Sequence, residues 1–383
     1  MNLRIFLLAI LLATPSMSAF DRVSGKDFAS RSEVIAQNGM VATSHPLATQ
    51  IGLDILKKGG NAIDAAIAAN IALGLMEPTG NGIGGDLFVI IWDEKSKKLY
   101  GLNASGPAPK DITIDYFKKN NLSKIPSYGP LPITVPGAVD GWIKMHERFG
   151  SINFEDLFIP TLNYARNGFP ISETIAYYLK SSSERFKSYP NFKDIWMPNN
   201  KILLKGDLFK NLHLANTLEV ISKTKRKSFY EGEIAKVMAS FVKEQGGFLS
   251  VNDLSSYHAE WVEPVSSNYR GYDVWELPPN GQGIAALQIL NVLENYNIKK
   301  MGLFSSEYIH HFVEAKKLAF EDRAKYYADP NFNKINIEHL ISKEYALDRM
   351  KLINSSKSMK SLEAGVLKDG DTIYLTTADK FGN

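Results

Sequence analysis

Residues 61–92 read NAIDAAIAANIALGLMEPTGNGIGGDLFVIIW, and this stretch decides the fold more than any other part of the chain. Asn61 is placed to cap a helix from Ala62 to Leu75, which is rich in alanine and apolar on more than one face, so we expect it to be buried. After Glu77-Pro78 and a glycine loop, the run from Asp86 to Trp92 is typical of an apolar strand. The stretch therefore predicts a helix that packs on a sheet.

The flanking residues extend this arrangement. They predict a strand at Met40 to Thr43, a helix from Pro46 to Lys58, and a strand from Lys97 to Leu102 that forms a hairpin with the apolar strand. The order helix, helix, strand, strand predicts a layered α/β fold rather than alternating βαβ units. With no internal repeat or linker, one domain is the simplest interpretation. Further helices are predicted at Gly137 to Phe149, Asn153 to Asn167, Ser172 through the 180s, Ile284 to Tyr296 and Glu307 to Tyr327, and a strand at Gly271 to Leu277.

The composition is that of an ordinary globular enzyme. The chain has 383 residues, a net charge of +3, 44% hydrophobic and 22% charged residues, and no cysteine. The lack of cysteine excludes disulfides, thiolate metal sites and a cysteine nucleophile, and the near-neutral charge argues against a nucleic-acid partner. The seven histidines lack the spacing of a metal site, so we expect neither a metal nor another cofactor. Glu321 and Asp322 are expected to form helix-surface or interhelical ion pairs, with a general-acid role as the alternative.

Residues 1–19 have the features of a secretory signal. Arg4 precedes an apolar run from Ile5 to Ala13, and small residues follow up to Ala19. The apolar run is about half of the ~20 residues that a membrane-spanning helix needs, so we expect export with cleavage rather than a stable membrane span. The expected location is secreted or periplasmic.

The glycine loop, Gly80–Gly85 (GNGIGG), matches the pattern G-x-G-x-x-G of dinucleotide-binding proteins. In those proteins the motif follows a strand and opens a helix, whose N-terminus meets the pyrophosphate. Here the predicted order is reversed. We therefore reject a dinucleotide site and interpret the loop as a close backbone approach beside another site, or as a plain bend.

Thr372 opens a β-branched run near the end of the chain, after Asp371. A threonine hydroxyl needs a base within hydrogen-bond reach, and the free α-amine of an N-terminal threonine can be that base if the chain is cut before it. The alternative is that Thr372 and the threonines after it are ordinary strand formers. The local sequence alone leaves both interpretations open.

Ordered motifs run along most of the chain. Together they resemble the γ-glutamyltranspeptidases (γ-glutamyltransferases), specifically the large subunit and the first residues of the small subunit, from about residue 34 to residue 383. The stretches that support this resemblance are Gly39–Ala48, Gly59–Ala66, Glu77–Gly85, Val135–Trp142, Ala165–Ser172, Phe229–Ala235, Pro278–Gly283 and Glu314–Pro330.

The resemblance implies an Ntn-hydrolase-type four-layer αββα sandwich, incomplete here because the second-subunit strands are missing, made as one precursor. With the signal peptide at 1–19, it implies a large subunit at 20–371 and the start of a small subunit at 372–383, with self-cleavage between Asp371 and Thr372. Thr372 is then the catalytic nucleophile that cleaves γ-glutamyl amides, such as glutathione, and passes the acyl group to water or an amine. The implied partners are this small-molecule substrate, or another acyl amide, and the chain's own small subunit. We expect the chain to be an inactive fragment of a longer product.

Ser105 is a departure from the family pattern. It lies in Asn103–Pro109, where members of the family usually carry an arginine that grips the substrate's α-carboxylate. As the implied substrate-binding residue, Ser105 offers one neutral hydrogen bond in place of the two charged hydrogen bonds of an arginine. This puts γ-glutamyl selectivity in doubt unless Arg166, Arg270 or an arginine beyond residue 383 takes that role. Two alternatives stay open: an acylase-like amide hydrolase with a non-glutamyl donor, and a secreted binding protein without chemistry that holds an anion on the amides of the glycine loop.

Overall fold

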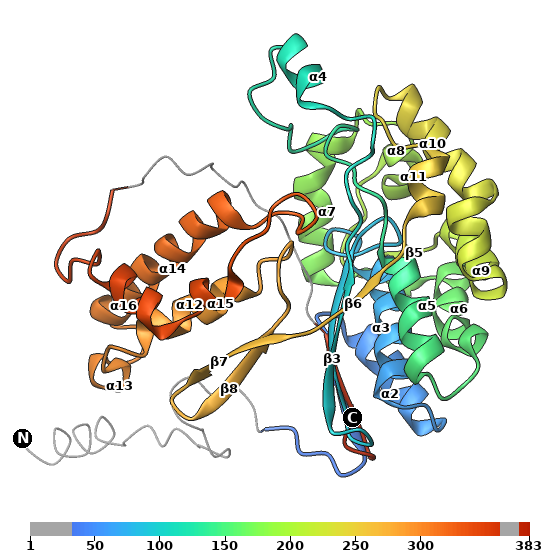
Figure 1. The fold of residues 1–383 in the computed structure, drawn as a ribbon. Helices are drawn as coiled ribbons and strands as arrows, with labels where there is room; N and C mark the ends of the chain where they lie inside the picture. Colours follow the sequence, from blue (N-terminus) through green and yellow to red (C-terminus); the bar gives the residue numbers. More distant parts are fainter. Residues whose placement is uncertain (1–32, 361–374) are drawn as a thin grey trace, which may run out of the picture. The chain divides into compact units, whose positions relative to one another are not determined.

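The computed structural model describes residues 33–360 and 375–383, whose arrangement Figure 1 shows. The chain divides into two units, Met1–Gln37 and Asn38–Asn383, and the described part of the first unit has no helix or strand. The strands of the second unit are β1 (Gly39–Ala42), β2 (Leu87–Asp93), β3 (Lys98–Ala104), β4 (Phe169–Pro170), β5 (Leu208–Phe209), β6 (Glu260–Val262), β7 (Val265–Tyr269), β8 (Tyr272–Glu276) and β9 (Thr376–Asp379). The α-helices are α2 (Pro46–Lys57), α3 (Ala62–Met76), α4 (Ile114–Lys119), α5 (Ala138–Phe149), α6 (Ile159–Asn167), α7 (Glu173–Phe186), α8 (Phe192–Trp196), α9 (Leu212–Thr224), α10 (Glu233–Glu244), α11 (Val251–Ser256), α12 (Ile284–Leu293), α13 (Ile298–Met301), α14 (Ser306–Tyr326), α15 (Ile337–Leu340) and α16 (Lys343–Met350).

Helix α3 is the centre of the main apolar core. The Asn61 side chain accepts hydrogen bonds from the second and third backbone N–H groups of the helix, and the Asp64 carboxylate accepts one from the Asn61 N–H at 3.0 Å. Every residue of α3 except Ala66 and Gly74 is buried. Apolar side chains of α2, α5, α6, α9 and β3 complete one continuous cluster, which we call the α3 core. The predicted buried helix is therefore confirmed.

The described strands form small antiparallel sheets. β3 lies between β2 and β6, and β7 and β8 form a separate hairpin. Within the β2–β3 pair, Phe88 stands opposite Asn103. Phe88, Ile90 and Trp92 are exposed on one face of β2, whereas the residues that alternate with them pack on the α3 core. The predicted hairpin is confirmed.

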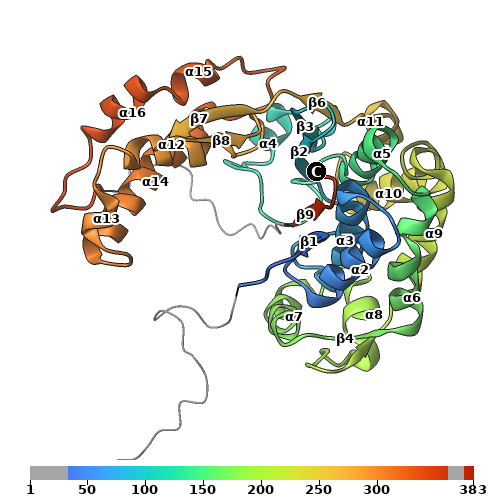
Figure 2. The same ribbon diagram turned by 90° about the horizontal axis from the view of Figure 1, so that it is seen from below.

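Strand β9 joins the last described residues to the beginning of the second unit, where it lies beside β1 and α3 (Figure 2). Gly39 of β1 stands opposite Asp379 of β9. The Asp379 carboxylate accepts a hydrogen bond from the Ala62 N–H at 3.1 Å, and the Thr377 hydroxyl donates to the Ala62 carbonyl at 2.7 Å. Because Asn61 caps the next two N–H groups of α3, Asp379 supplies the partner that the first one needs.

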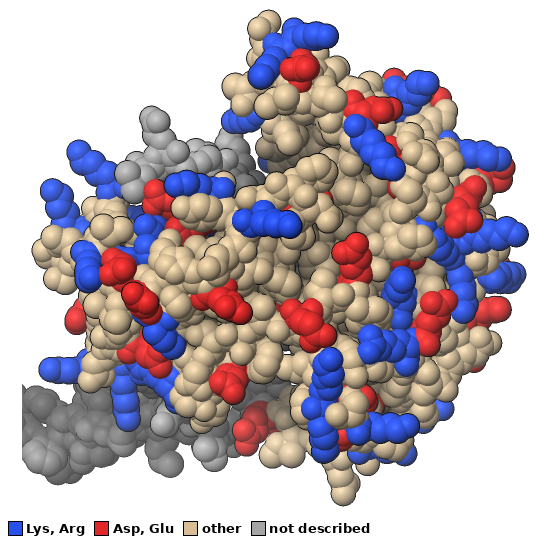
Figure 3. All heavy atoms as spheres, in the orientation of Figure 1, with Lys and Arg blue, Asp and Glu red and all other residues tan. Residues whose placement is uncertain are grey.

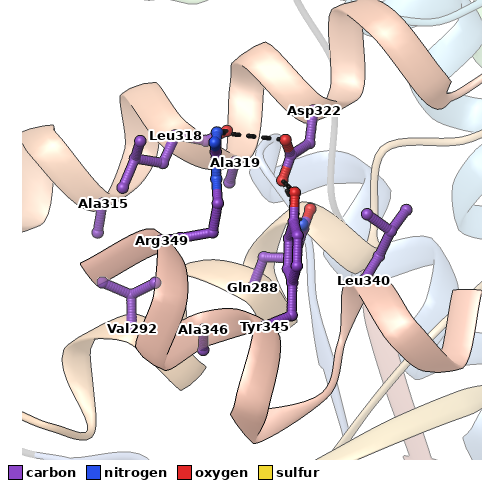
Figure 4. A pocket seen from close by; sticks show the side chains of 10 residues that line it. All are labelled: Gln288, Val292, Ala315, Leu318, Ala319, Asp322, Leu340, Tyr345, Ala346 and Arg349. Atoms are coloured by element: carbon purple, nitrogen blue, oxygen red, sulfur yellow. Dashed lines mark hydrogen bonds and ion pairs between the residues drawn. The ribbon is translucent and has the colours of Figure 1, made fainter. Parts of the chain in front are cut away.

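Helices α12 to α16 (residues 284–350) form the helical C-terminal region, whose buried apolar residues gather in two small clusters. A polar network around Asp322 lies among these helices (Figure 4). The Asp322 carboxylate accepts hydrogen bonds from Gln288 Nε2 at 2.8 Å and the Tyr345 hydroxyl at 3.0 Å, and it lies 3.3 Å from the Arg349 guanidinium. These side chains line a cavity of about 10 Å³, close to the smallest that holds one water molecule. The expected interhelical ion pair of Asp322 is confirmed.

One predicted helix is divided in the structure. Residues 153–167 form a 3₁₀ turn, Phe154–Leu157, followed by α6, which begins at Ile159. Pro160 lies in the first turn of α6, where its missing N–H is tolerated, whereas in the interior of a longer helix it would break a backbone hydrogen bond. The proline therefore explains why one predicted helix became two elements.

Candidate active site

Of the predicted site residues, only Ser105 lies within the described part of the chain. Asp371 and Thr372 lie outside the described residues, so their roles stay predictions. Ser105 directly follows β3 and is partly buried.

Ser105, Asn103 and Asn280 form a closed ring of hydrogen bonds, which we call the amide ring. Ser105 Oγ donates to Asn103 Oδ1 at 2.7 Å, Asn103 Nδ2 donates to Asn280 Oδ1 at 2.7 Å, and Asn280 Nδ2 donates to Ser105 Oγ at 2.9 Å. The Ser105 backbone N–H adds a further bond to Asn103 Oδ1 at 3.0 Å. Asn280 belongs to the motif Pro278–Gly283, so the ring joins two segments that lie 175 residues apart in the sequence.

Two glycines bring the loop after β3 into backbone contact with the start of α5. A β-carbon at Gly106 would lie 1.7 Å from the Val135 carbonyl oxygen, and a β-carbon at Gly137 would lie 1.9 Å from the Ala104 carbonyl oxygen. No side chain fits at either position. The Val135 N–H donates to the Pro107 carbonyl at 3.0 Å, which fixes the register of this contact.

The glycine loop, Gly80–Gly85, is hydrogen-bonded to the start of α5 as well. The Gly85 carbonyl accepts hydrogen bonds from the Gly137 and Ala138 N–H groups at 2.9 Å and 3.0 Å, and the Asn81 side chain donates to the Asn70 carbonyl of α3 at 2.8 Å. The loop connects α3 to β2, so its place in the chain agrees with the rejection of a dinucleotide site. The loop approaches the backbone at the start of α5 closely, which agrees with its interpretation as a close backbone approach.

A buried ion pair supports the start of α5. Asp140 is 2% exposed, lies 2.8 Å from Arg226 Nη1 and accepts a hydrogen bond from the Ala259 N–H at 2.6 Å. The Tyr257 hydroxyl is buried near Gly137, has no hydrogen-bond partner among the described residues, and has its pKa raised well above the ordinary range by burial. The sequence offered no signal for this pair beyond the presence of Asp140 in a recognised motif, because Arg226 lies 86 residues away.

Arg166 and Arg270, the two arginines of this chain that could replace the family's arginine, each bind another group. Arg166 pairs with Glu219 of α9, and Arg270 donates from Nη2 to the Tyr296 carbonyl at 2.8 Å. Glu276 lies beneath the loop that holds Asn280, and burial raises its pKa above the ordinary value. Figure 3 shows acidic and basic side chains interspersed over the face in view. The amide ring itself consists of three neutral side chains.

The described residues contain neither a cluster of metal ligands nor a membrane-spanning helix. Within 33–360 and 375–383, no group of three or more potential metal-ligating side chains is close enough together to hold a metal ion. In the same ranges, no helix has both the length and the apolar character needed to cross a membrane.

Comparison with known protein families assigns the chain to one family. The family model for gamma-glutamyltranspeptidase matches residues 48–383. The chain therefore belongs to the gamma-glutamyltranspeptidase family.

Among its relatives is the glutathione hydrolase-like YwrD proenzyme of Bacillus subtilis (strain 168), which is 37% identical over 352 residues. The match covers 91% of this chain and 66% of the relative, so the chain spans slightly less than two thirds of that protein.

Solved structures show the same fold. Cephalosporin acylase from Bacillus halodurans has a TM-score of 0.83 at 39% sequence identity, with 94% of this chain and 67% of that chain covered. Helicobacter pylori gamma-glutamyltranspeptidase has a TM-score of 0.81 at 34% identity, with 88% and 99% covered. The predicted α/β fold of the Ntn-hydrolase type is thereby confirmed.

Proposed function

We propose that the chain is the large-subunit part, with the first residues of the small subunit, of an exported, self-processing threonine amidase and acyltransferase. The proposed division is a signal peptide at 1–19, a large subunit at 20–371 and the start of the small subunit at 372–383. The observation on which the proposal rests is the family match through residues 48–383, which includes Asp371 and Thr372. The name proenzyme, given to the Bacillus subtilis relative, is in keeping with a precursor that is cut.

The contacts of β9 support a cut before Thr372. β9 pairs with β1, and Asp379 accepts a hydrogen bond from the buried N-terminus of α3. A segment that begins at Thr372 would therefore stay attached to the large subunit by contacts that do not depend on the cleaved peptide bond.

In the proposed reaction, Thr372 Oγ attacks the carbonyl carbon of an acyl amide, and the α-amine freed by the cut accepts the hydroxyl proton. As the C–N bond breaks, that proton passes to the leaving amine and the acyl group remains on Oγ as an ester. Water or an amine acceptor then attacks the ester and returns a proton to Oγ. In the precursor, the same Oγ attacks the Asp371 carbonyl carbon, the Asp371–Thr372 C–N bond breaks and the hydroxyl proton passes to the freed Thr372 nitrogen. Water then hydrolyses the ester to the Asp371 carboxylic acid and the free Thr372 hydroxyl. The chemistry needs no cofactor.

Two classes of acyl donor fit this chemistry. The first is a γ-glutamyl amide such as glutathione, supported by the similarity to the Helicobacter pylori gamma-glutamyltranspeptidase. The second is an uncharged acyl amide, favoured by the neutral hydrogen bonds of Ser105 with Asn103 and Asn280. The fold similarity to a cephalosporin acylase is in keeping with a donor other than a γ-glutamyl amide.

The test of the nucleophile is the fate of the full-length precursor. Thr372→Ala should remain one uncut chain, and Thr372→Ser should be cut more slowly, because the acyl shift requires a hydroxyl. Thr376→Ala, at an exposed position of β9, is the matched control and should be cut as the unmodified protein is. Gel electrophoresis shows whether the chain is cut, and N-terminal sequencing gives the first residue of each fragment. The amino terminus of the larger fragment should lie near Ala19 or Phe20. A Thr372→Ala chain that still splits, with a new amino terminus at 372, would show that the nucleophile lies elsewhere.

A further inference from the structure

The direction of every hydrogen bond in the amide ring follows from one backbone group. The Ser105 N–H can only donate, so the Asn103 atom that it meets is the carbonyl oxygen. The amide nitrogen of Asn103 then faces Asn280, whose facing atom has to be its oxygen. This leaves the nitrogen of Asn280 facing Ser105 Oγ, which accepts from it and donates to Asn103.

This polarity determines which groups are left for a ligand. The Ser105 hydroxyl hydrogen is already used within the ring, so Ser105 cannot donate to a substrate unless the ring opens. The amide nitrogens of Asn103 and Asn280 each carry a second hydrogen, for which the described residues provide no partner. The ring therefore offers two uncharged donors and no cation.

An exposed aromatic side chain lies beside these donors. Phe88 stands opposite Asn103 in the β2–β3 pair, so the two side chains share one face of the sheet. The Phe88 ring also approaches the loop of Asn280, because a β-carbon at Gly281 would lie 3.4 Å from it. Phe88 is 39% exposed. The face thus combines an apolar surface with neutral N–H donors.

We propose that Asn280 is a specificity-determining residue for the acyl donor: together with Asn103 it binds an uncharged acceptor oxygen, such as an amide or ester carbonyl, on an acyl group whose apolar part rests on Phe88. Ser105 positions the two amides and does not itself contact the donor. This inference rests on the proposed function, since it assigns a donor class to the same enzyme.

The preference for a neutral donor follows from desolvation. A carboxylate that enters the site gives up strong hydration, and only a charged partner or several hydrogen bonds compensate for that loss. A neutral carbonyl gives up less and can accept the same two N–H groups. We therefore expect the ring to discriminate between carboxylate and carboxamide groups of the same shape.

The experiment compares two nearly isosteric donors in the full-length protein. They are the p-nitroanilides of glutaric acid, with a terminal carboxylate, and of 4-carbamoylbutanoic acid, with a terminal carboxamide. The unmodified protein should have a kcat/KM about tenfold or more higher for the carboxamide donor. Asn280→Ala should lower kcat/KM for the carboxamide donor by about three- to tenfold, which is the effect of one lost neutral hydrogen bond, and should change the value for the carboxylate donor less than about twofold.

A second variant separates donor recognition from loop structure. Asn280→Asp keeps the oxygen that accepts from Asn103 but replaces the donor nitrogen with a negative charge, so kcat/KM for the carboxylate donor should fall by about tenfold or more. Gln282→Ala is the matched control, because Gln282 is exposed in the same loop and its side chain makes no hydrogen bond to a described residue. Its donor ratio should equal that of the unmodified protein. All variants should undergo self-cleavage at the normal rate.

The outcomes separate a failure of this inference from a failure of the proposed function. A protein that splits at Thr372 and prefers the carboxylate donor overturns the inference alone. So does an Asn280→Ala variant in which both donors lose activity by the same factor, because that result indicates a structural role. A protein that remains uncut and cleaves neither anilide overturns the proposed function and this inference with it.

Discussion

The region around α3 and the helical C-terminal region have different interiors, and each contains a buried aspartate. The α3 core is one large apolar cluster, and Asp379 lies at its edge, where it accepts hydrogen bonds from backbone and side-chain N–H groups. The helical C-terminal region has two small apolar clusters, with Asp322 among polar side chains between the helices.

The two carboxyl groups have opposite pKa shifts. Burial acts to raise the pKa of Asp379, but hydrogen bonds from the Asn383 side chain and from the Ala62, Asn383 and Phe381 N–H groups outweigh it and hold the pKa below its ordinary value. Burial raises the pKa of Asp322 above its ordinary value, and the opposing effects of Arg349, Tyr345 and Gln288 do not compensate. A buried carboxylate thus stabilises this fold where enough N–H groups converge on it, and costs stability where they do not.

The largest effect that separates the two regions should come from core truncation. Leu73→Ala, in the fully buried α3, should lower the free energy of unfolding by about 3–5 kcal/mol, because the close-packed surroundings cannot collapse around the cavity. Leu340→Ala, in a small cluster near the surface, should cost about 2 kcal/mol. Urea unfolding of both variants measures the difference, with the exposed Leu352→Ala as the control. Equal losses in the two regions would contradict the contrast between one large core and two small ones.

A somewhat smaller effect is expected from Asp379. Asp379→Ala leaves the buried Ala62 N–H without a partner and removes hydrogen bonds to a charged acceptor, so it should lower the free energy of unfolding by about 2–4 kcal/mol. Asp379→Asn should lose less, since its one remaining oxygen can accept part of the set. Chemical denaturation checks both values. Lys380 is the next residue and is exposed, so Lys380→Ala should change the free energy of unfolding by less than about 0.5 kcal/mol. An equally small change for Asp379→Ala would show that the Asp379 hydrogen bonds do not stabilise the fold.

The smallest expected effect is on pH dependence, and its sign differs between the two aspartates. Because the pKa of Asp322 is raised, its contribution to stability is fully present below the ordinary value of 3.8 and is lost as the pH rises through the folded-state pKa. Because the pKa of Asp379 is lowered, its contribution is present above 3.8 and is lost as the pH falls through the folded-state pKa.

Asp322→Asn should therefore abolish the loss of stability that the unmodified protein shows as the pH rises above 3.8, because asparagine stays uncharged at every pH. The measurement is the melting temperature of the variant and the unmodified protein at matched pH values. Asp379→Asn provides the comparison of opposite sign. If both variants gained, or both lost, stability relative to the unmodified protein as the pH rises, the assignment of opposite shifts would be wrong.

The sequence predicted the α3 region well because its signals are local. Asn61, the alanine-rich run after it and the apolar strand that follows specify a capped buried helix and a hairpin without knowledge of distant contacts. Asp322 was also expected in an ion pair, but its burial depends on Gln288, Tyr345 and Arg349, which come from other helices. No periodicity in the sequence encodes such a network.

The candidate site shows the same limit. Ser105 was singled out by its place in a motif, but its hydrogen-bond partner Asn280 lies 175 residues away, and no spacing rule connects them. Asp379 reaches Ala62 over a separation of 317 residues. Thr372 stays a prediction from the resemblance. Only folding brings together neutral residues such as Asn103 and Asn280, whose chemistry gives no signal when each is read alone.

The backbone contact made by Gly106 and Gly137 has a consequence for how this protein can evolve new specificity. A β-carbon at either glycine meets a carbonyl oxygen at less than 2 Å, so random mutagenesis at these two positions should return almost only glycine among folded variants. Ser105 directly precedes Gly106 and is partly exposed, and Asn280, which is bonded to it, is exposed, so substitutions at these two positions meet less of the packed interior. Mutational tolerance should therefore be greater in the amide ring than at the two glycines, and a small library at 103, 105 and 280 would test the proposed role of the ring in donor choice.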